Sequence, residues 1–285
     1  MRPPLKWPGG KHRVLSHLIP RLRGGQRLVE PFAGSGVVTL NAGFEEGWLN
    51  DANPDLITFY ECLRDQPDDM VTLARTWFRP AMNDPEAFAV ARRQFNRTRS
   101  PLEKAALLLY LNKHSFNGLV RYNRSGFFNA PFGRYEAPAF PEKALWAMHA
   151  GLQRVRLTAW SFEAVLAEAR EGDVLYCDPP YDPLTPTSSF SDYATEGFGP
   201  EEQQRLAVGA VERARQGNRV LISNHDTPRT RQWYSPARKY TFRVSRSISC
   251  KGERRGKAAE VLALFTPGIV RAHDRAREGG EREAG

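Results

Sequence analysis

Val174-Leu175-Tyr176-Cys177-Asp178-Pro179-Pro180-Tyr181 is an apolar run that ends in an acid, two prolines and an aromatic residue. A short apolar run of this kind is typical of a buried parallel strand. Neither proline can donate an N–H, so the strand should stop at Cys177. In open α/β sheets ligands bind at the carboxyl ends of strands, which is where this sequence places Asp178 and Tyr181.

These residues suit one kind of ligand. The Asp178 carboxylate and the Pro179 carbonyl are both hydrogen-bond acceptors, and together they can hold both hydrogens of a flat amino group. Tyr181 can stack on the attached ring. The pattern therefore indicates a site for the exocyclic amine of a nucleobase. The alternative is that Asp-Pro-Pro is an ordinary turn, because these residues are common in turns.

A second strand–loop–helix unit lies near the amino terminus. The pattern predicts a strand at 28–30, a tight loop at 31–36, a helix at 37–44 and a strand at 48–50 that ends at Asp51. Gly34 and Gly36 let a ligand approach the backbone, and an acid at the end of the next strand commonly binds ribose hydroxyls. Since the loop is not G-x-G-x-x-G, we expect an adenosine-containing cofactor without a pyrophosphate. Many such loops, however, need glycine for geometry alone.

The remaining pattern completes an α/β fold. Residues 54–114 are predicted to be helical, with helices that begin near Pro85 and Pro101, and a hairpin is predicted around the turn at 123–126. After residue 150 strands and helices alternate again: strands at 155–160, 174–177, 220–223 and 260–265, and helices at 161–170 and 200–216. We therefore expect a doubly wound α/β domain in two pieces with a helical segment and hairpin inserted. Residues 269–285 have little apolar content and are expected to be disordered.

Composition narrows the class of partner and compartment. The 285 residues are 41% hydrophobic and carry a net charge of +9, which favours a polyanionic partner; a genome rich in G and C is the other cause of excess arginine. The three cysteines are far apart and have no metal-binding spacing, so no metal site is expected. No signal peptide and no run of 18 apolar residues is present, and we expect a cytoplasmic protein without a membrane span.

A further segment near the amino terminus reads Lys6-Trp7-Pro8-Gly9-Gly10-Lys11. It is followed by Glu-Pro-Phe-Ala-Gly-Ser-Gly at 30–36, Asn-Asp-Ala-Asn-Pro-Asp-Leu-Ile at 50–57, Asp-Pro-Pro-Tyr at 178–181 and Ser-Asn-His-Asp at 223–226. In this order and spacing, over roughly residues 5–268, the chain resembles the Dam-type N6-adenine DNA methyltransferases of the D12 class, α group. On its own, the Trp7 segment would equally suit a tryptophan packed on the core.

The resemblance implies a Rossmann-like sheet and the cofactor S-adenosylmethionine. It implies a catalytic domain made of residues 1–55 and 145–268, and an inserted target-recognition domain at 56–144. By residue, it implies catalysis by Asp178, Pro179, Pro180 and Tyr181, and cofactor binding by Trp7, Lys11, Glu30, Phe32, Gly34, Gly36, Asp51 and Asp178. The reaction implied is methyl transfer to adenine N6.

The partner implied is double-stranded DNA, in which GATC is the expected site, and no obligate protein partner is indicated. The expected DNA-binding residues are Lys6, Phe116, Asn117, Leu119, Arg121, Asn123, Pro131 and Arg134. Phe116 departs from the family pattern, where a tyrosine is usual. It can wedge into the space left by a flipped base, or it can pack in the core. Arg121 can read a guanine edge or bind a phosphate.

Three features remain open on the sequence alone. Phe190 or Tyr193 can close over the flipped base opposite Tyr181. His225 borders the same strand end, but a structural role is at least as well supported, since Asp226 precedes a helix start at Thr227-Pro228. The basic cluster Lys251, Arg254, Arg255 and Lys257 is either a phosphate-binding loop or a solvated turn.

Two other classes of function compete with adenine methylation. Cytosine N4, guanine N2 in RNA and a protein glutamine are methylated at related Asn/Asp-Pro-Pro-aromatic sites. A catalytically silent DNA-binding protein could also keep this fold. The inserted segment and Asp178 favour DNA adenine, and the intact set of Lys11, Asp51, Asp178 and Tyr181 favours an enzyme.

Overall fold

A computed structural model describes residues 1–184, 198–245 and 257–283. The chain divides into two compact units: Met1–Ser16 with Ala33–Trp160, and His17–Phe32 with Ser161–Gly285. We refer to them as the first and second unit and describe each by itself. The functional division into a catalytic and an inserted recognition domain is a different partition, and it stays a prediction.

The strands form a mixed sheet with the order β3-β2-β1-β4-β5-β7-β6. Their bounds are β1 Arg27–Glu30, β2 Glu46–Asn50, β3 Val155–Thr158, β4 Val174–Cys177, β5 Arg219–His225, β6 Arg238–Ser245 and β7 Lys257–Phe265. The predicted α/β sheet is confirmed, and β4 is the parallel strand expected from its apolar run. β6 was not predicted, because Arg238, Lys239 and Arg243 interrupt its apolar pattern.

Within the second unit the strand order reverses direction between β1 and β4. These strands pair in parallel, with Leu28 opposite Val174, and β4 pairs in parallel with β5 on its other side. β7 then runs antiparallel between β5 and β6. The point where the order reverses is the usual ligand site of an open α/β sheet, and here the adjacent strands end at Glu30 and Cys177.

Helices of the second unit complete its layers. They are α8 Phe162–Glu168, α9 Pro200–Arg215, α10 Pro228–Trp233 and α11 Pro267–Glu283. The short helix α1, Leu15–Leu18, has only its last two residues in this unit. α10 begins where the sequence predicted, after an N-cap at Thr227. Among the described residues, no helix combines the length and apolar character needed to cross a membrane.

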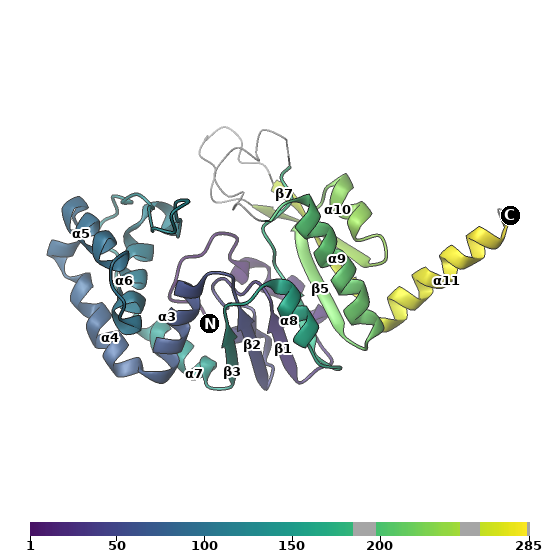
Figure 1. Cartoon of the computed structure of the whole chain (residues 1–285), viewed down its shortest axis with the longest axis horizontal. Coiled ribbons are helices and arrows are strands. Elements are labelled where there is room, and N and C mark those ends of the chain that lie inside the picture. Colours follow the sequence, from purple (N-terminus) through teal and green to yellow (C-terminus); the bar gives the residue numbers. More distant parts are fainter. Residues whose placement is uncertain (185–197, 246–256, 284–285) are drawn as a thin grey trace. The chain divides into compact units, whose positions relative to one another are not determined.

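The disordered tail predicted for 269–285 is wrong over most of its length, because α11 occupies 267–283 and leads away from the end of β7 (Figure 1). Arginine, alanine and glutamate are good helix formers even where few apolar residues are present. Val270 is buried, and Arg215 on α9 pairs with Asp274 at 3.1 Å. Low apolar content therefore was a poor sign of disorder here.

Helices dominate the first unit, as the sequence predicted for 54–114. They are α2 Thr39–Ala42, α3 Pro54–Asp65, α4 Pro67–Arg75, α5 Pro85–Phe95, α6 Pro101–His114 and α7 Glu142–Leu152. Helices α3 to α6 gather into one helical region (Figure 1) with α6 buried along most of its length. A proline opens each of these four, where its missing N–H costs nothing.

The predicted hairpin is present in reduced form. Its turn closes with a hydrogen bond from Gly126 N to Asn123 O at 2.9 Å, but pairing is limited to single bridges, Tyr122 with Phe128 and Ser115 with Phe132. Asn96 replaces further ladder bonds, since its side chain bonds both the N–H and the carbonyl of Phe128. We call residues 115–135 the recognition hairpin.

Candidate active site

Asp178 follows the last residue of β4 and lies beside β5. One carboxylate oxygen, Oδ1, accepts a hydrogen bond of 2.7 Å from Ser223 Oγ, and Ser223 Oγ lies 3.0 Å from the hydroxyl of Tyr176. Ser223 and Tyr176 are both buried. The acid is thus oriented from one side by a buried hydroxyl. A carboxylate has room for further hydrogen bonds at its second oxygen.

The residues after Asp178 are held in place by side chains from two elements. Gln203 on α9 donates to the Pro180 carbonyl at 2.6 Å, and the Asn224 side chain on β5 accepts from the Asp182 N–H at 2.9 Å. Asn224 in turn donates to Gln203 at 3.0 Å. The Asp182 carboxylate is buried and accepts hydrogen bonds from Thr227 and Arg229. The segment 178–182 is therefore anchored at three successive points.

Tyr181 lies against the end of β5. Its ring meets the ring of His225 edge to face, with centroids 4.9 Å apart, and its hydroxyl donates to Glu260 at 3.3 Å. Burial, followed by the charge of Asp178, raises the pKa of Tyr181 well above its ordinary value. The phenol therefore stays neutral, and the side chain offers an aromatic face rather than a charge.

His225 makes a contact that fits the structural role, one of the two roles that the sequence left open for it. Its Nδ1 lies 2.6 Å from the carbonyl of Asp182, so the imidazole holds the loop that carries the acid. The geometry supports keeping His225 out of the catalytic set.

Glu30 and Phe32 lie at and just beyond the end of β1 in the same unit. Glu30 is buried. The ring of Phe32 stacks on Phe162 at 5.5 Å and meets Phe198 edge to face at 5.3 Å. These three rings form an apolar wall next to the strand end.

In the first unit, the glycine loop leaves no room for side chains. Gly34 has φ +49° and Gly36 has φ +65°, which is the left-handed region that favours glycine. A Cβ on Gly34 would lie 2.7 Å from Cδ1 of Trp7, so the indole packs directly on this loop. The structure thus brings Trp7 and Gly34 together across 27 residues of sequence, as expected for two parts of one pocket.

Asp51 closes the same loop. Its Oδ2 accepts from the Gly34 N–H at 2.9 Å and its Oδ1 from the Asn53 N–H at 3.0 Å. Burial raises the pKa of Asp51, and these two hydrogen bonds oppose that rise. Each oxygen keeps a lone pair for a hydroxyl group, so the carboxylate can bind a ribose while it fixes the loop.

Lys11 completes the expected cofactor set in this unit. It opens a short 3-10 helix, Lys11–Val14, is largely buried, and donates to the Gly9 carbonyl at 2.6 Å. A flat aromatic ring, a glycine loop, a carboxylate and a cation are the groups that an adenosyl amino acid requires. The residues present therefore fit S-adenosylmethionine.

Most of the expected DNA-binding residues are exposed on the recognition hairpin. Seven of the eight are exposed: Lys6 near the amino terminus and, on the hairpin, Phe116, Asn117, Arg121, Asn123, Pro131 and Arg134. Asn117 and Arg134 are also the non-glycine residues with positive φ among those described, at +54° and +48°. Unfavourable backbone conformations of this type concentrate at functional sites.

Arg121 and Asn123 already have partners within the hairpin. Arg121 donates from Nε to Asn129 Oδ1 at 2.8 Å and from Nη2 to Asn129 O at 3.0 Å. Asn123 Oδ1 accepts from the N–H groups of Ser125 and Phe127, which shapes the turn. The Arg121 guanidinium is thus held extended across the hairpin, whereas the Asn123 carbonyl oxygen serves the backbone.

A buried asparagine that the sequence did not single out joins this hairpin to the amino terminus. Asn112 accepts from the Lys6 N–H at 2.8 Å and donates to the carbonyls of Lys6 and Gly118. The ammonium of Lys6 lies 4.2 Å from the centre of the Tyr135 ring. Leu119 follows the 3-10 turn Phe116–Gly118, and its carbonyl accepts from Ser115 Oγ at 2.8 Å.

Sequence reasoning missed the residues that brace the Asp178 segment. Ser223 and Asn224 belong to the Ser-Asn-His-Asp motif that carried the resemblance, but the motif gave them no role. Gln203 had no signal, because it lies inside an ordinary amphipathic helix.

Several expected residues lie outside the described part of the chain. They are Phe190 and Tyr193, and from the basic cluster Lys251, Arg254 and Arg255. Lys257, the last of that cluster, begins β7.

Comparison with known proteins gives a consistent result. The profile of the D12 class N6 adenine-specific DNA methyltransferases matches residues 7–248. The DNA adenine methylase of Escherichia coli strain K12 is 43% identical over 266 residues, covering 93% of this chain and 96% of that protein. The DNA adenine methylase of Vibrio cholerae serotype O1 is 43% identical over 92% of this chain and 95% of its own length. A DNA N-6-adenine-methyltransferase of Escherichia phage P1 is 42% identical over 91% of this chain, which corresponds to 35% of the phage protein.

Among solved structures, a human methyltransferase 10 domain containing protein covers 88% of this chain at 9% identity, and the match spans 79% of its own length with a TM-score of 0.38. At that score the likeness adds nothing to what the strand order establishes.

Proposed function

The chain belongs to the D12 class N6 adenine-specific DNA methyltransferases, and on that premise we propose that Asp178, Pro179 and Tyr181 hold the adenine whose N6 is methylated. Methyl transfer to adenine N6 in DNA is the activity of the family. The single observation that carries the residue assignment is the Asp178 carboxylate, oriented by Ser223 at the end of β4.

The proposed role of Asp178 and Pro179 follows from the low nucleophilicity of adenine N6. Its lone pair is delocalised into the ring, which makes the amine a poor nucleophile. When Asp178 and the Pro179 carbonyl accept the two N6 hydrogens, the nitrogen moves toward tetrahedral geometry and its lone pair becomes available. The residues thus act by positioning and by charge complementarity, which are effective ways to lower a barrier. The N6 proton leaves after the transfer.

We assign cofactor binding to Trp7, Lys11, Gly34, Gly36 and Asp51, joined by Glu30, Phe32 and Asp178. S-adenosylmethionine, when bound, supplies a methyl group on a sulfonium, which is an excellent leaving group. The support is the packing of Trp7 on the Gly34 loop and the half-buried Asp51 that closes it. Trp7 offers its ring face, and Asp51 keeps acceptor capacity for ribose hydroxyls.

The substrate we propose is duplex DNA with the target base turned out of the helix. N6 of a paired adenine lies inside the duplex, so the base must leave the stack to reach Asp178. Tyr181 then stacks on it. Phe116 is 46% exposed at the start of the recognition hairpin, which supports a wedge in preference to core packing.

We propose GATC as the sequence methylated, and Arg121 as the reader of one guanine. The support is the exposed position of Arg121 and the way Asn129 holds its guanidinium. An arginine donates two hydrogen bonds to O6 and N7 of guanine in the major groove.

Two measurements test the proposal. Plasmid DNA free of methylation is treated with the protein and S-adenosylmethionine, then digested to nucleosides and sequenced for modified bases. N6-methyladenine confined to GATC is expected. N4-methylcytosine would contradict the assignment of adenine as the target base, and N6-methyladenine in another sequence would contradict the assignment of GATC.

The second measurement uses Asp178→Ala. Loss of a positioned polar group at a reacting centre typically lowers kcat by about 100-fold or more. Transfer of labelled methyl groups should fall by at least that factor, and near-normal turnover would remove Asp178 from the catalytic set.

A further inference from the structure

The recognition hairpin has two faces that alternate along its strands. Tyr122 and Phe128 form a bridge, with their rings edge to face at 5.9 Å, and Phe128 is buried. We call the side of the hairpin on which these two rings lie the inner face. Two pairs flank this bridge, each closed by a backbone hydrogen bond of 2.9 Å: Arg121 with Asn129, and Asn123 with Phe127. Since successive side chains of a strand point to opposite faces, both pairs lie together on the outer face.

The inner face is fixed by contacts with the helical region. Asn96, directly after α5, accepts from the Phe128 N–H at 2.8 Å and donates to the Phe128 carbonyl at 3.1 Å. The Phe128 ring lies 5.5 Å from that of Phe95. On the other strand, the Tyr122 hydroxyl donates to Asp55 on α3 at 2.7 Å. Both strands of the hairpin are therefore anchored from behind.

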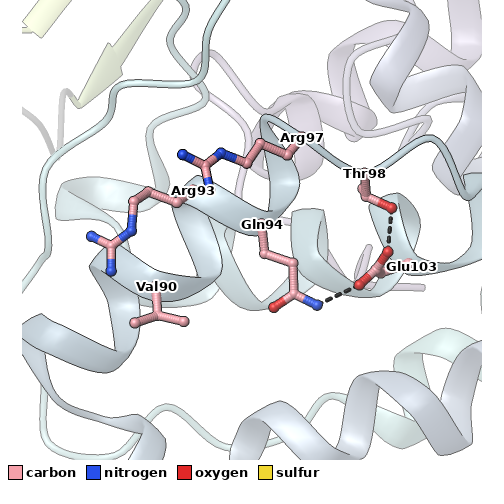
Figure 2. A pocket seen from close by; sticks show the side chains of 6 residues that line it. All are labelled: Val90, Arg93, Gln94, Arg97, Thr98 and Glu103. Carbon is pink, nitrogen blue, oxygen red and sulfur yellow. Dashed lines mark hydrogen bonds between the residues drawn. The ribbon is translucent and has the colours of Figure 1, made fainter.

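The end of α5, to which the hairpin is anchored, is itself tied to α6. Gln94 and Thr98, on either side of Asn96 in the sequence, both donate to Glu103 on α6 (Figure 2). These three side chains help to line an open hollow at the helix end. The outer face of the hairpin therefore keeps a fixed position on the helical region.

Phe127 is the side chain of the outer face that has no role so far. It is 50% exposed, and Phe116 is the other exposed phenylalanine in the part of the chain that the structure describes. Asn123 holds the Phe127 backbone twice: its N–H donates to the Phe127 carbonyl, and its Oδ1 accepts from the Phe127 N–H, both at 2.9 Å. The ring is thus held outward, and it can make apolar contacts only.

Two residues of the hairpin have proposed places on the DNA. Phe116 lies where the target adenine leaves the stack, and Arg121 reads a guanine, which we take to be the one paired to the last cytosine of GATC. The direction from Phe116 to the turn then leads out of the site. The Asn123–Phe127 pair lies two residues beyond Arg121, about 7 Å at about 3.4 Å per residue. Base pairs also rise by about 3.4 Å, so the Phe127 ring lies about two base pairs outside GATC.

One group in the major groove suits such a ring. The 5-methyl group of thymine is apolar, and phenylalanine is among the side chains that contact it, whereas the other groups on base edges are hydrogen-bond donors and acceptors. We propose that Phe127 packs on the 5-methyl group of a thymine about two base pairs outside GATC. The inference rests on the proposed function, because it takes the GATC duplex as the substrate and Arg121 as the reader of its outer guanine. Phe127 thereby adds a preference for flanking sequence to the choice of GATC.

The experiment removes a single methyl group from the DNA. GATC is placed in self-complementary duplexes, so that both orientations of the protein meet the same flanks. Thymine at the first, second or third base pair outside the site, on either strand, is compared with uracil, which lacks only the 5-methyl group. For the wild type, uracil at one of these positions should lower kcat/KM by about fourfold, the effect of one buried methyl group. For Phe127→Ala the ratio of thymine to uracil should be close to one.

Controls separate the methyl contact from other effects of the substitution. At the same position, 5-methylcytosine should exceed cytosine by the same factor, because these bases share only the methyl group with the thymine and uracil pair. Phe127→Leu keeps an apolar side chain and should keep part of the ratio. Val90→Ala removes a side chain that is 47% exposed on α5 and should keep all of it. Since Phe127 is exposed, thermal unfolding of Phe127→Ala should match the wild type.

A wild-type ratio near one at every flanking position would overturn the proposal, and so would a ratio that Phe127→Ala leaves intact. An equal loss by Phe127→Ala on thymine and uracil duplexes would assign the ring to the structure of the hairpin instead. Affinity for the same duplexes is measured by fluorescence anisotropy, and methylation of GATC by the wild type is scored on its own. If methylation fails, the proposed function fails, while the ratio of affinities still decides whether Phe127 contacts the methyl group.

Discussion

The orientation of one carboxylate depends on one hydroxyl. Ser223 donates to Asp178 Oδ1 at 2.7 Å from the adjacent strand, and the Tyr176 hydroxyl lies 3.0 Å from Ser223 Oγ. A hydrogen bond to a charged group contributes about 1.5–3 kcal/mol. Ser223 is therefore a positioning residue for Asp178, because it selects which oxygen faces the substrate.

We expect Ser223→Ala to lower kcat by about tenfold or more, since about 1.4 kcal/mol corresponds to a factor of ten in rate. The KM for S-adenosylmethionine should change less than kcat, because Asp178 is only one of the residues assigned to the cofactor and the Trp7–Asp51 cluster is untouched. Steady-state kinetics on a GATC duplex measures both constants. Ser223→Thr keeps the hydroxyl and should recover activity, and Tyr176→Phe should have the smaller effect. Equal falls in kcat for the alanine and threonine variants would point to a packing defect instead.

At the scale of elements, the recognition hairpin is built from single bridges and side-chain bonds. Asn96, Asn112 and Asn123 each replace bonds that a longer β-ladder would supply. Such a segment can present several exposed side chains without a long edge strand. Its reading ability then depends on how individual side chains are held, and Arg121 is the clearest case.

Arg121→Ala distinguishes base reading from phosphate binding. Base reading predicts a loss of about 1–3 kcal/mol on GATC and little loss on duplexes altered at the one base pair it reads. Phosphate binding predicts the same loss on every sequence. Methylation rates on GATC and its single-base variants give the answer. Asn129→Ala is the matched variant, since it removes the hydrogen bond from Arg121 Nε to the Asn129 side chain and keeps the guanidinium, and it should cost less than Arg121→Ala.

The carboxyl-terminal turn of α6 carries a lysine with an unusual environment. Burial, and then the charge of Lys6, lower the pKa of Lys113 from 10.5 to about 8. The unfolded chain keeps the higher value, so it binds this proton more tightly between about pH 8 and 10.5. The free energy of unfolding therefore rises with pH across that window as the folded lysine becomes neutral.

Lys113→Met should remove this contribution, which is on the order of 3 kcal/mol for a shift of this size. The variant should be more stable than the wild type at pH 7, and the difference should shrink as the pH approaches 10. Urea unfolding at several pH values measures it. Lys143→Met, at an exposed lysine, is the control, and a stability difference independent of pH would contradict the assignment.

At the scale of the whole molecule, the net charge of +9 determines how binding responds to salt. Each DNA phosphate that the chain neutralises releases counterions, so affinity for a duplex should fall steeply as salt rises. A plot of log affinity against log salt should have a slope of about −0.9 for each phosphate contact. Anisotropy measurements from about 50 to 200 mM salt test this. A flat response would show that the charge reflects composition and has no part in binding DNA.

The sequence by itself determined the features of local structure, such as where helices and strands begin or end and where the chain turns. Two prolines end β4 after Cys177, prolines open α3 to α6, Asn123 and Gly126 close a turn, and two glycines take left-handed conformations before α2. Each of these features depends on residues within a few positions of one another in the chain, so the sequence alone is enough to predict it. The family followed from several such motifs in order. The assignments of individual site residues remain predictions.

Partners distant in sequence were decided only by the tertiary structure. Ser223 reaches Asp178 because β4 and β5 pair with Cys177 opposite Ile222, and a register slip of one residue would turn Ser223 to the other face. Gln203 reaches Pro180 from a helix whose own pattern shows only an amphipathic face. α11 is ordered although its composition suggested otherwise, because Val270 finds a buried position. Register and burial are properties of the assembled chain, and no local pattern encodes them.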